Sequence, residues 1–289
     1  PPMSKQVPFT IKIFVADGDP DGLRVVERSN WTGKSLMFPR TLYPQVRSRP
    51  EFQQTGVYLL LGPSADGNGE TLYVGEGDPV KPRFEDHYVK KDFWTRAVFF
   101  VAPGQLNKAH VQFLEAQLVG LAGAAKRASL ENGNKPTEPT LSEADRADME
   151  VFLHNMLGVL PVLGVYAFEQ SAVGVGPSNL VLFCKGRGAS ASGYDTPQGF
   201  VVRSSSLASE SETPSLSGFP IVGRTRSELR KNGVLVPESG KLRFTQNYTF
   251  NSPSLASAVV LGRASNGRVD WKDAAGRTLR EYQQAQTDA

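Results

Sequence analysis

Short apolar stretches separated by polar turns occur along the first hundred positions and indicate β-strands; residues 8–15 alternate with the two-residue period of a strand, and residues 57–61 form a continuous apolar run typical of a buried one. An Asp- and Gly-rich turn separates the first two such stretches, and a polar loop separates the fourth from the fifth, so each pair is expected to be antiparallel. The strands that this pattern predicts are residues 8–15, 23–26, 35–38, 57–61, 71–74 and 95–101.

Three stretches change to the period of a helix. Asp78-Pro79 offers an N-cap acceptor followed by Pro, which favours a helix start that places Arg83 and His87 four residues apart on one face. Asn107 is expected to cap a helix over residues 108–127, in which Glu115 lies beside the apolar stripe. A third helix is predicted to begin near Ser142 and to pack through one apolar face.

The second half of the chain returns to short apolar runs between Gly- and Ser-rich turns. Strands are predicted at residues 162–168, 180–185 and 199–203. Ser204–Gly218 contains few apolar residues and is interpreted as a flexible loop or linker.

This order of strands and helices predicts an α+β fold. The expected organisation is a small three-stranded antiparallel sheet flanked by helices, with a β element before it and an α+β accessory domain after it. The parts are the N-terminal β element, residues 1–50; the central domain, residues 51–135; a connecting helix and β region with the flexible loop, residues 136–220; and the C-terminal accessory domain, residues 221–289.

Charge is distributed unevenly although the net charge of the 289 residues is only +3. Residues 81–127 carry eight basic and four acidic side chains, and residues 221–289 carry eleven and six. The acidic stretch 128–169, with two basic and seven acidic side chains, lies between them. Two basic regions favour a polyanionic partner, and solvated surface is the alternative for either one alone.

Cysteine content limits the chemistry and the compartment. Cys184 is the single cysteine, so one chain forms no disulfide framework and no structural zinc site with several Cys ligands. This favours a reducing compartment, and we expect a cytoplasmic protein. The sequence has no apolar run long enough to span a bilayer and no signal-peptide pattern at its start, so no membrane partner is expected.

The most informative residues follow one another in a fixed order: Gly56-Val57-Tyr58, Tyr73-Val74-Gly75, Arg83, His87 and Glu115. Taken singly, each has an ordinary explanation, because Tyr is common in strands, Arg on surfaces and Glu at the edges of helices. Taken together, they supply hydroxyls, a guanidinium, an imidazole and a carboxylate. Hydrolysis of a phosphodiester needs these groups to activate water and to balance charge on the phosphate.

This ordered set resembles the GIY-YIG nuclease superfamily over roughly residues 50–135, with Val in place of Ile in both triplets. The resemblance implies a three-stranded antiparallel sheet flanked by helices. It also implies hydrolysis of phosphodiester bonds with one divalent cation, Mg²⁺, for which Mn²⁺ would be the substitute. One carboxylate completed by water and phosphate oxygens suits Mg²⁺, which keeps several waters when it binds.

The resemblance assigns a role to each residue of the set. Glu115 would hold the cation, Arg83 would contact the scissile phosphate, and Tyr58 would position or deprotonate the attacking water with help from Tyr73 or His87. Which of those three is the general base stays open at this point.

Substrate contacts are assigned less directly. Gly75 would lie against the substrate. The superfamily often has an Asn after the helix that bears the Glu; Asn132 is the match here, with Asn134 as the alternative.

A second resemblance concerns the last part of the chain. Residues 250–263, Asn266-Gly267, Trp271-Lys272 and Gly276 are similar to an accessory domain of unknown function that often follows GIY-YIG modules in bacterial proteins. Small domains of this kind are suspected of reading DNA. Trp271 is the candidate substrate contact in it, and packing in a core is the more common role of such a residue.

These features predict a metal-dependent DNA endonuclease, in a setting of bacterial restriction, repair or defence against foreign DNA. Double-stranded DNA is the favoured substrate and single-stranded DNA the alternative. Cutting both strands with one active site per chain would favour a homodimer. The competing hypothesis is a nucleic-acid-binding protein that keeps the nuclease fold without significant catalysis.

Overall fold

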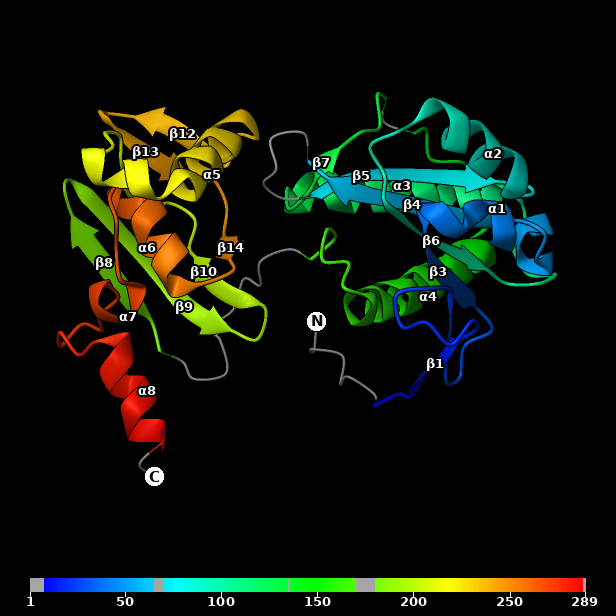
Figure 1. Ribbon diagram of the computed structural model, residues 1–289, viewed down its shortest axis with the longest axis horizontal. Helices are drawn as coiled ribbons and strands as arrows, with labels where there is room; N and C mark the ends of the chain where they lie inside the picture. Colours follow the sequence, from blue (N-terminus) through cyan, green and yellow to red (C-terminus); the bar gives the residue numbers. More distant parts are fainter. Residues whose placement is uncertain (1–7, 65–69, 135, 170–179, 288–289) are drawn as a thin grey trace. The chain divides into compact units, whose positions relative to one another are not determined.

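The computed structural model describes residues 8–64, 70–134, 136–169 and 180–287. It has the α+β composition expected from the sequence, which is confirmed. The chain divides into two compact units, residues 1–169 and residues 170–289. Each unit has a sheet and a hydrophobic core, and each is described by itself below (Figure 1).

The first unit is built on a seven-stranded sheet with the strand order β1-β2-β3-β6-β4-β5-β7. Neighbouring strands are antiparallel except β5 and β7, which run parallel. The strands are β1 (Ile11–Val15), β2 (Arg24–Arg28), β3 (Lys34–Pro39), β4 (Gly56–Pro63), β5 (Glu70–Gly77), β6 (Arg96–Val101) and β7 (Ser129–Leu130).

Helices cover both faces of this sheet. Asn107 and Ser142 cap α3 and α4, each by accepting a hydrogen bond from the backbone N–H three residues later. The helices are α1 (Tyr43–Val46), α2 (Lys81–Lys90), α3 (Lys108–Ala125) and α4 (Glu143–Val159), with the 3-10 helices η1 (Arg40–Leu42), η2 (Pro50–Gln53) and η3 (Leu160–Leu163).

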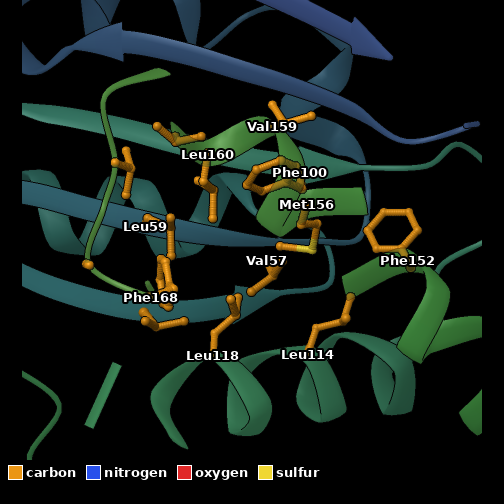
Figure 2. Packing of buried hydrophobic residues seen from close by; sticks show 14 of the residues in the cluster. Val57, Leu59, Phe100, Leu114, Leu118, Phe152, Met156, Val159, Leu160 and Phe168 are labelled. Carbon is orange, nitrogen blue, oxygen red and sulfur yellow. The ribbon is translucent and has the colours of Figure 1, made fainter. Parts of the chain in front are cut away.

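Alternating side chains of β4 enter two different cores. Val57, Leu59 and Leu61 pack with residues of α3 and α4, and Figure 2 shows Leu114 and Leu118 of α3 and Phe152 and Met156 of α4 around Val57 and Leu59. Tyr58 and Leu60 face the opposite core, which is rich in aromatic rings from the N-terminal strands and α2. A period of two along the strand therefore separates the tyrosine from the aliphatic core.

The sheet is larger than we expected. The three predicted central strands are present as the neighbours β6, β4 and β5, but they are part of the seven-stranded sheet. The N-terminal residues extend it because β3 pairs with β6 along its whole length, from Lys34 opposite Val101 to Pro39 opposite Arg96. The predicted strand at residues 162–168 was wrong, since those residues continue from η3 into turns.

The second unit has an antiparallel sheet with the order β12-β13-β11-β9-β10-β14, and β8 also pairs with β9. Helix α6 packs on the sheet and has all of its last six residues buried. The elements are β8 (Leu182–Gly186), β9 (Ala189–Thr196), β10 (Gly199–Val202), β11 (Leu207–Ser209), β12 (Leu235–Glu238), β13 (Lys241–Phe244), β14 (Tyr248–Phe250), η4 (Pro214–Gly218), α5 (Pro220–Lys231), α6 (Pro253–Leu261), α7 (Gly267–Asp270) and α8 (Leu279–Thr287).

Ser204–Gly218 is not a flexible linker within this unit. It contains β11, whose Ala208 is buried opposite Leu242 of β13, and the helix η4. Arg226 of α5 is also buried and fixes this segment, because its guanidinium donates to Glu212 and to the carbonyl oxygen of Ser209. The division that we expected at residues 220 and 221 would cut this sheet, and the observed division falls between residues 169 and 170.

Within the residues that the structure describes, no helix combines the length and the apolar character that are needed to cross a bilayer.

Candidate functional site

The two tyrosine triplets face each other across β4 and β5. Tyr58 lies opposite Gly75, and Leu60 lies opposite Tyr73, so both tyrosine side chains are on the same face of the sheet. A Cβ atom on Gly75 would come within 2.4 Å of the Tyr58 hydroxyl oxygen. Gly75 is therefore required by the ring of Tyr58, which lies directly over it, and this accounts for the glycine without a substrate contact.

Helix α2 brings His87 to these tyrosines. The Nε2 atom of His87 lies 2.8 Å from the hydroxyl oxygen of Tyr58 in a buried hydrogen bond. The ring centroids of His87 and Tyr73 are 4.9 Å apart, and those of Tyr58 and Tyr73 are 6.3 Å apart. The structure thus places an imidazole and two phenols in mutual contact, as their order in the sequence suggested.

Burial decides the protonation of this group. It lowers the pKa of His87 to about 4, so the ring is neutral at neutral pH. Burial also raises the pKa of Tyr58 and of Tyr73 above the ordinary phenol value. Tyr58 therefore keeps its proton in the metal-free protein, although Arg83 acts in the opposite direction, and the neutral His87 ring is its immediate neighbour for proton exchange.

Glu115 projects from α3 and is half-buried. Desolvation raises the pKa of its carboxyl to about 7, and the nearby Glu76 carboxylate adds to this effect. In the described part of the chain, Glu115 has no ion pair and no side-chain hydrogen bond. A half-buried carboxylate without a partner is costly, and a bound cation would remove that cost.

Arg83 lies on α2 one turn before the buried His87, and its own side chain is exposed. It is close enough to Tyr58, Tyr73 and Glu115 to influence the pKa of each. No ion pair engages its guanidinium among the described residues, so its donors are available to an anion. We call Tyr58, Tyr73, Arg83, His87 and Glu115 the five-residue site.

Three further charged residues belong to this region and were missed in the sequence. Lys108 donates to both carboxylate oxygens of the buried Glu76, at 2.6 and 2.8 Å. The ammonium of Lys91 lies 4.5 Å from the centroid of the Tyr73 ring. Glu76 could have been noticed as a charge inside an apolar strand, next to Gly75; the two lysines give no local signal.

The donor set fits one type of cation better than others. The described residues contain no group of three or more His, Cys, Asp or Glu side chains arranged to hold a metal ion. A site with Glu115 as its single free carboxylate would leave the remaining positions to water and phosphate oxygens. That coordination suits Mg²⁺, or Mn²⁺ as a substitute, and does not suit zinc, which takes three or four protein ligands.

Asn132 has a structural partner. Its side-chain amide donates to the carbonyl oxygen of Val74 and accepts from the Val74 N–H, at 2.8 and 3.0 Å. This pair of bonds fixes the chain after β7 to β5 and occupies the groups that were assigned to a substrate. Asn134, the alternative, is exposed in the loop that follows.

The assignment of Trp271 as a substrate contact was wrong. Its side chain has no exposed surface, its ring centroid lies 4.5 Å from that of Phe200, and its indole N–H donates to the carbonyl oxygen of Pro253. A ring that is enclosed in this way offers no face to a base, so Trp271 is a core residue.

Comparison with known proteins bears on the second unit only. Residues 182–283 match a family described as "Domain of unknown function (DUF4357)". No curated protein and no solved structure matches the chain. The match agrees with an accessory domain of unknown function at the C-terminal end, and it begins at the start of β8, well before the expected boundary at residue 221.

Proposed function

We propose that the chain is a metal-dependent endonuclease of the GIY-YIG type that hydrolyses phosphodiester bonds in DNA. The observation that carries this proposal is the buried hydrogen bond between Tyr58 and His87, in the same region as the carboxylate of Glu115 and the guanidinium of Arg83, neither of which has an ion pair with any residue that the structure describes. A protein that only bound DNA would have no use for a buried phenol–imidazole pair next to a half-buried carboxylate. The arrangement of β6, β4 and β5 with α2 and α3 supports the same family.

In the proposed reaction, a water oxygen forms a bond with phosphorus while the bond from phosphorus to the leaving sugar oxygen breaks. The water proton passes to the oxygen of Tyr58 as the Tyr58 proton passes to Nε2 of His87, which requires this nitrogen to be unprotonated beforehand. Among the three candidates left open by the sequence, we therefore propose His87 as the final proton acceptor, with the buried Tyr58 hydroxyl as the relay that passes the proton to it.

Arg83 would hold the scissile phosphate through its free donors, and Lys91 and Lys108 would add positive potential nearby. Glu115 would hold the Mg²⁺ ion, which when bound stabilises negative charge on the phosphate and on the leaving oxygen. Bacterial restriction, repair or defence remains the proposed setting, with double-stranded DNA as the favoured substrate and a homodimer as the form that cuts both strands.

Cleavage of plasmid, linear, single-stranded and modified-base DNA in Mg²⁺, Mn²⁺ or EDTA tests the proposal. We expect cleavage that depends on the cation and is lost in Glu115→Ala while DNA binding is retained. Glu131→Ala removes an exposed carboxylate of the same unit and is expected to cut like the unaltered protein.

Two results would decide against the proposal. If Glu115→Ala cut DNA at the same rate as the unaltered protein, Glu115 would not be the metal ligand. Tight binding without cutting of any substrate would favour the alternative, a nucleic-acid-binding protein that keeps this fold without catalysis.

A further inference from the structure

A hollow of about 470 Å³ lies on the second unit. It has the volume of an ordinary ligand site. We call it the Phe183 hollow, and its lining residues are Phe183, Lys185, Asp270, Lys272, Asp273, Ala274 and Gly276.

Strand geometry places three of these side chains together. Phe183 and Lys272 exchange both backbone hydrogen bonds across an antiparallel bridge, at 2.6 and 3.0 Å, so their side chains lie on the same side. Lys185 is two residues further along β8 and shares that side. Its ammonium lies 5.9 Å from the centroid of the Phe183 ring.

The aromatic ring of Phe183 is exposed to solvent. Phe183 is 36% exposed, although its neighbours Leu182 and Cys184 in β8 are buried. An exposed aromatic face in a hollow, with ammonium groups beside it, can stack with a flat ring that carries negative charge nearby.

The carboxylates that line the hollow are engaged by other residues of the unit, whereas its ammonium groups are open to a ligand. Both oxygens of Asp270 accept hydrogen bonds, from Arg263 and Ser265, and both oxygens of Asp273 accept bonds, from Tyr282 and from the backbone of the turn at residues 275–277. Neither Lys185 nor Lys272 has an ion pair within the described ranges. Arg263 balances the charge of Asp270 in an ion pair, whereas Asp273 bonds to uncharged donors and keeps its charge. The two ammonium groups of the hollow therefore outnumber one unbalanced carboxylate.

We propose that the Phe183 hollow binds single-stranded nucleic acid, with one unpaired base stacked on Phe183 and the adjoining phosphates at Lys185 and Lys272. A duplex keeps its bases paired and stacked on one another, so it cannot offer the face that the Phe183 ring requires. The site lies outside the five-residue site and does not need cleavage to occur. It shares with the proposed nuclease function only the class of ligand.

Binding is measured on the full-length chain with Glu115→Ala, in EDTA, so that the result does not depend on cleavage. The probe is a fluorescent oligothymidylate, compared with a blunt duplex and with thymidine monophosphate. In this background we expect Phe183→Ala to weaken oligothymidylate binding by about tenfold, the usual effect of losing one stacked base. Phe219→Ala removes a 52% exposed ring outside the hollow and is expected to leave binding unchanged.

The lysines are tested by salt dependence. Loss of two phosphate contacts in Lys185→Gln/Lys272→Gln should reduce the slope of log affinity against log salt by about 1.4. Arg224→Gln/Lys231→Gln removes two exposed charges on α5 and should leave the slope unchanged. Phe183→Trp should keep affinity, and the fluorescence of the new indole should be quenched by the bound base.

Three outcomes would overturn the inference. If Phe183→Ala and Phe219→Ala bound oligothymidylate with equal affinity, no base would be stacked on Phe183. Thymidine monophosphate that binds as tightly as the oligonucleotide would make the hollow a site for free nucleotides. If Phe183→Ala weakened binding of the duplex and left binding of oligothymidylate unchanged, the hollow would contact phosphates and would not stack with an unpaired base. None of these results depends on whether the five-residue site cuts DNA, so the two proposals fail separately.

Discussion

At the scale of single residues, the burial of Tyr58 and His87 changes the chemistry that the sequence suggested. A phenol that deprotonates water near neutral pH needs a lowered pKa, but burial raises the pKa of Tyr58 and keeps its proton in place. The same burial keeps His87 unprotonated, with its pKa lowered to about 4. Together the two environments favour the neutral pair, in which the Tyr58 hydroxyl donates to the unprotonated Nε2 atom of His87, so Tyr58 fits the role of a proton relay better than that of a phenolate base.

Replacing Tyr58 tests this transfer. Tyr58→Phe keeps the buried ring and removes only the hydroxyl that lies 2.8 Å from His87, so cleavage should fall by about 100-fold or more while the fold is retained. Tyr43 is a matched control, because its buried hydroxyl has no hydrogen-bond partner in the described structure. Tyr43→Phe should cut at the normal rate, and an equal loss in both variants would attribute the effect to packing.

Glu115 makes a prediction about pH. Its folded pKa of about 7 lies above its ordinary value of 4.5, so the metal-free native state holds a proton that the unfolded chain has lost between these values. The contribution of Glu115 to the free energy of unfolding is therefore lost as the pH rises from 4.5 to 7. Glu115→Gln should raise the free energy of unfolding by about 3 kcal/mol at most at pH 8, and by much less at pH 5.

His87 acts with the opposite sign, because its folded pKa of about 4 lies below its ordinary value of 6.5 and its contribution is lost as pH falls through that window. The difference between Glu115→Gln and the unaltered chain isolates Glu115. Urea unfolding in EDTA measures it, with Glu131→Gln as an exposed control. Added Mg²⁺ at pH 8 should stabilise the unaltered chain alone, and a difference that does not grow with pH would contradict the assignment.

The residues that sequence reasoning found and missed differ in a physical way. Tyr58, Tyr73 and His87 were found because a strand pair and one helical turn, both local patterns, bring them together. Lys108 could not be assigned, since its ion pair with Glu76 spans 32 positions. Trp271 was misassigned because exposure depends on the packing of the whole second unit.

At the scale of elements, local periodicity predicted most strands and helices but not their partners. The predicted strands at residues 57–61, 71–74 and 95–101 correspond to β4, β5 and β6. Pairing of β3 with β6 and the insertion of β11 beside β13 join segments distant in sequence. A three-residue strand in a polar stretch, as β11 is, gives no periodic signal.

The antiparallel pairing of β4 and β5 explains the glycine at position 75 and provides a prediction. Gly75→Ala would place a Cβ atom 2.4 Å from the Tyr58 hydroxyl, so the ring must move away from His87. We expect a loss of cleavage and of about 1–3 kcal/mol in stability. Gly120→Ala in α3, where a Cβ meets nothing within 4 Å, should instead add about 0.5–1 kcal/mol, and thermal unfolding compares the two. Full activity in Gly75→Ala would show that the position of the Tyr58 ring is not critical.

At the scale of the whole molecule, each unit has its own sheet and its own core, and the family match lies entirely within the second. The boundary expected at residue 135 followed the extent of the GIY-YIG resemblance, and the boundary expected at residue 220 followed the stretch 204–218, which has few apolar residues. Packing crosses both positions. Helix α4 covers the core of the first unit, and β10 and β11 pair with β14 and β13, which follow residue 220.

Fragments test which division is physical. Residues 1–169 and residues 170–289 should each unfold cooperatively in urea, because no strand or core cluster is divided between them. Residues 1–135 should fail to fold, because this fragment lacks α4. Without Phe152, Met156 and Val159 of that helix, the remaining side chains of the aliphatic core would be exposed to water. Residues 221–289 should fail as well, because β13 would lose β11. If residues 1–169 fold and cut DNA while residues 170–289 bind oligothymidylate without cutting, then cleavage and single-strand binding reside in separate units. Cooperative folding of residues 1–135 alone would instead restore the smaller nuclease domain that the sequence pattern indicated.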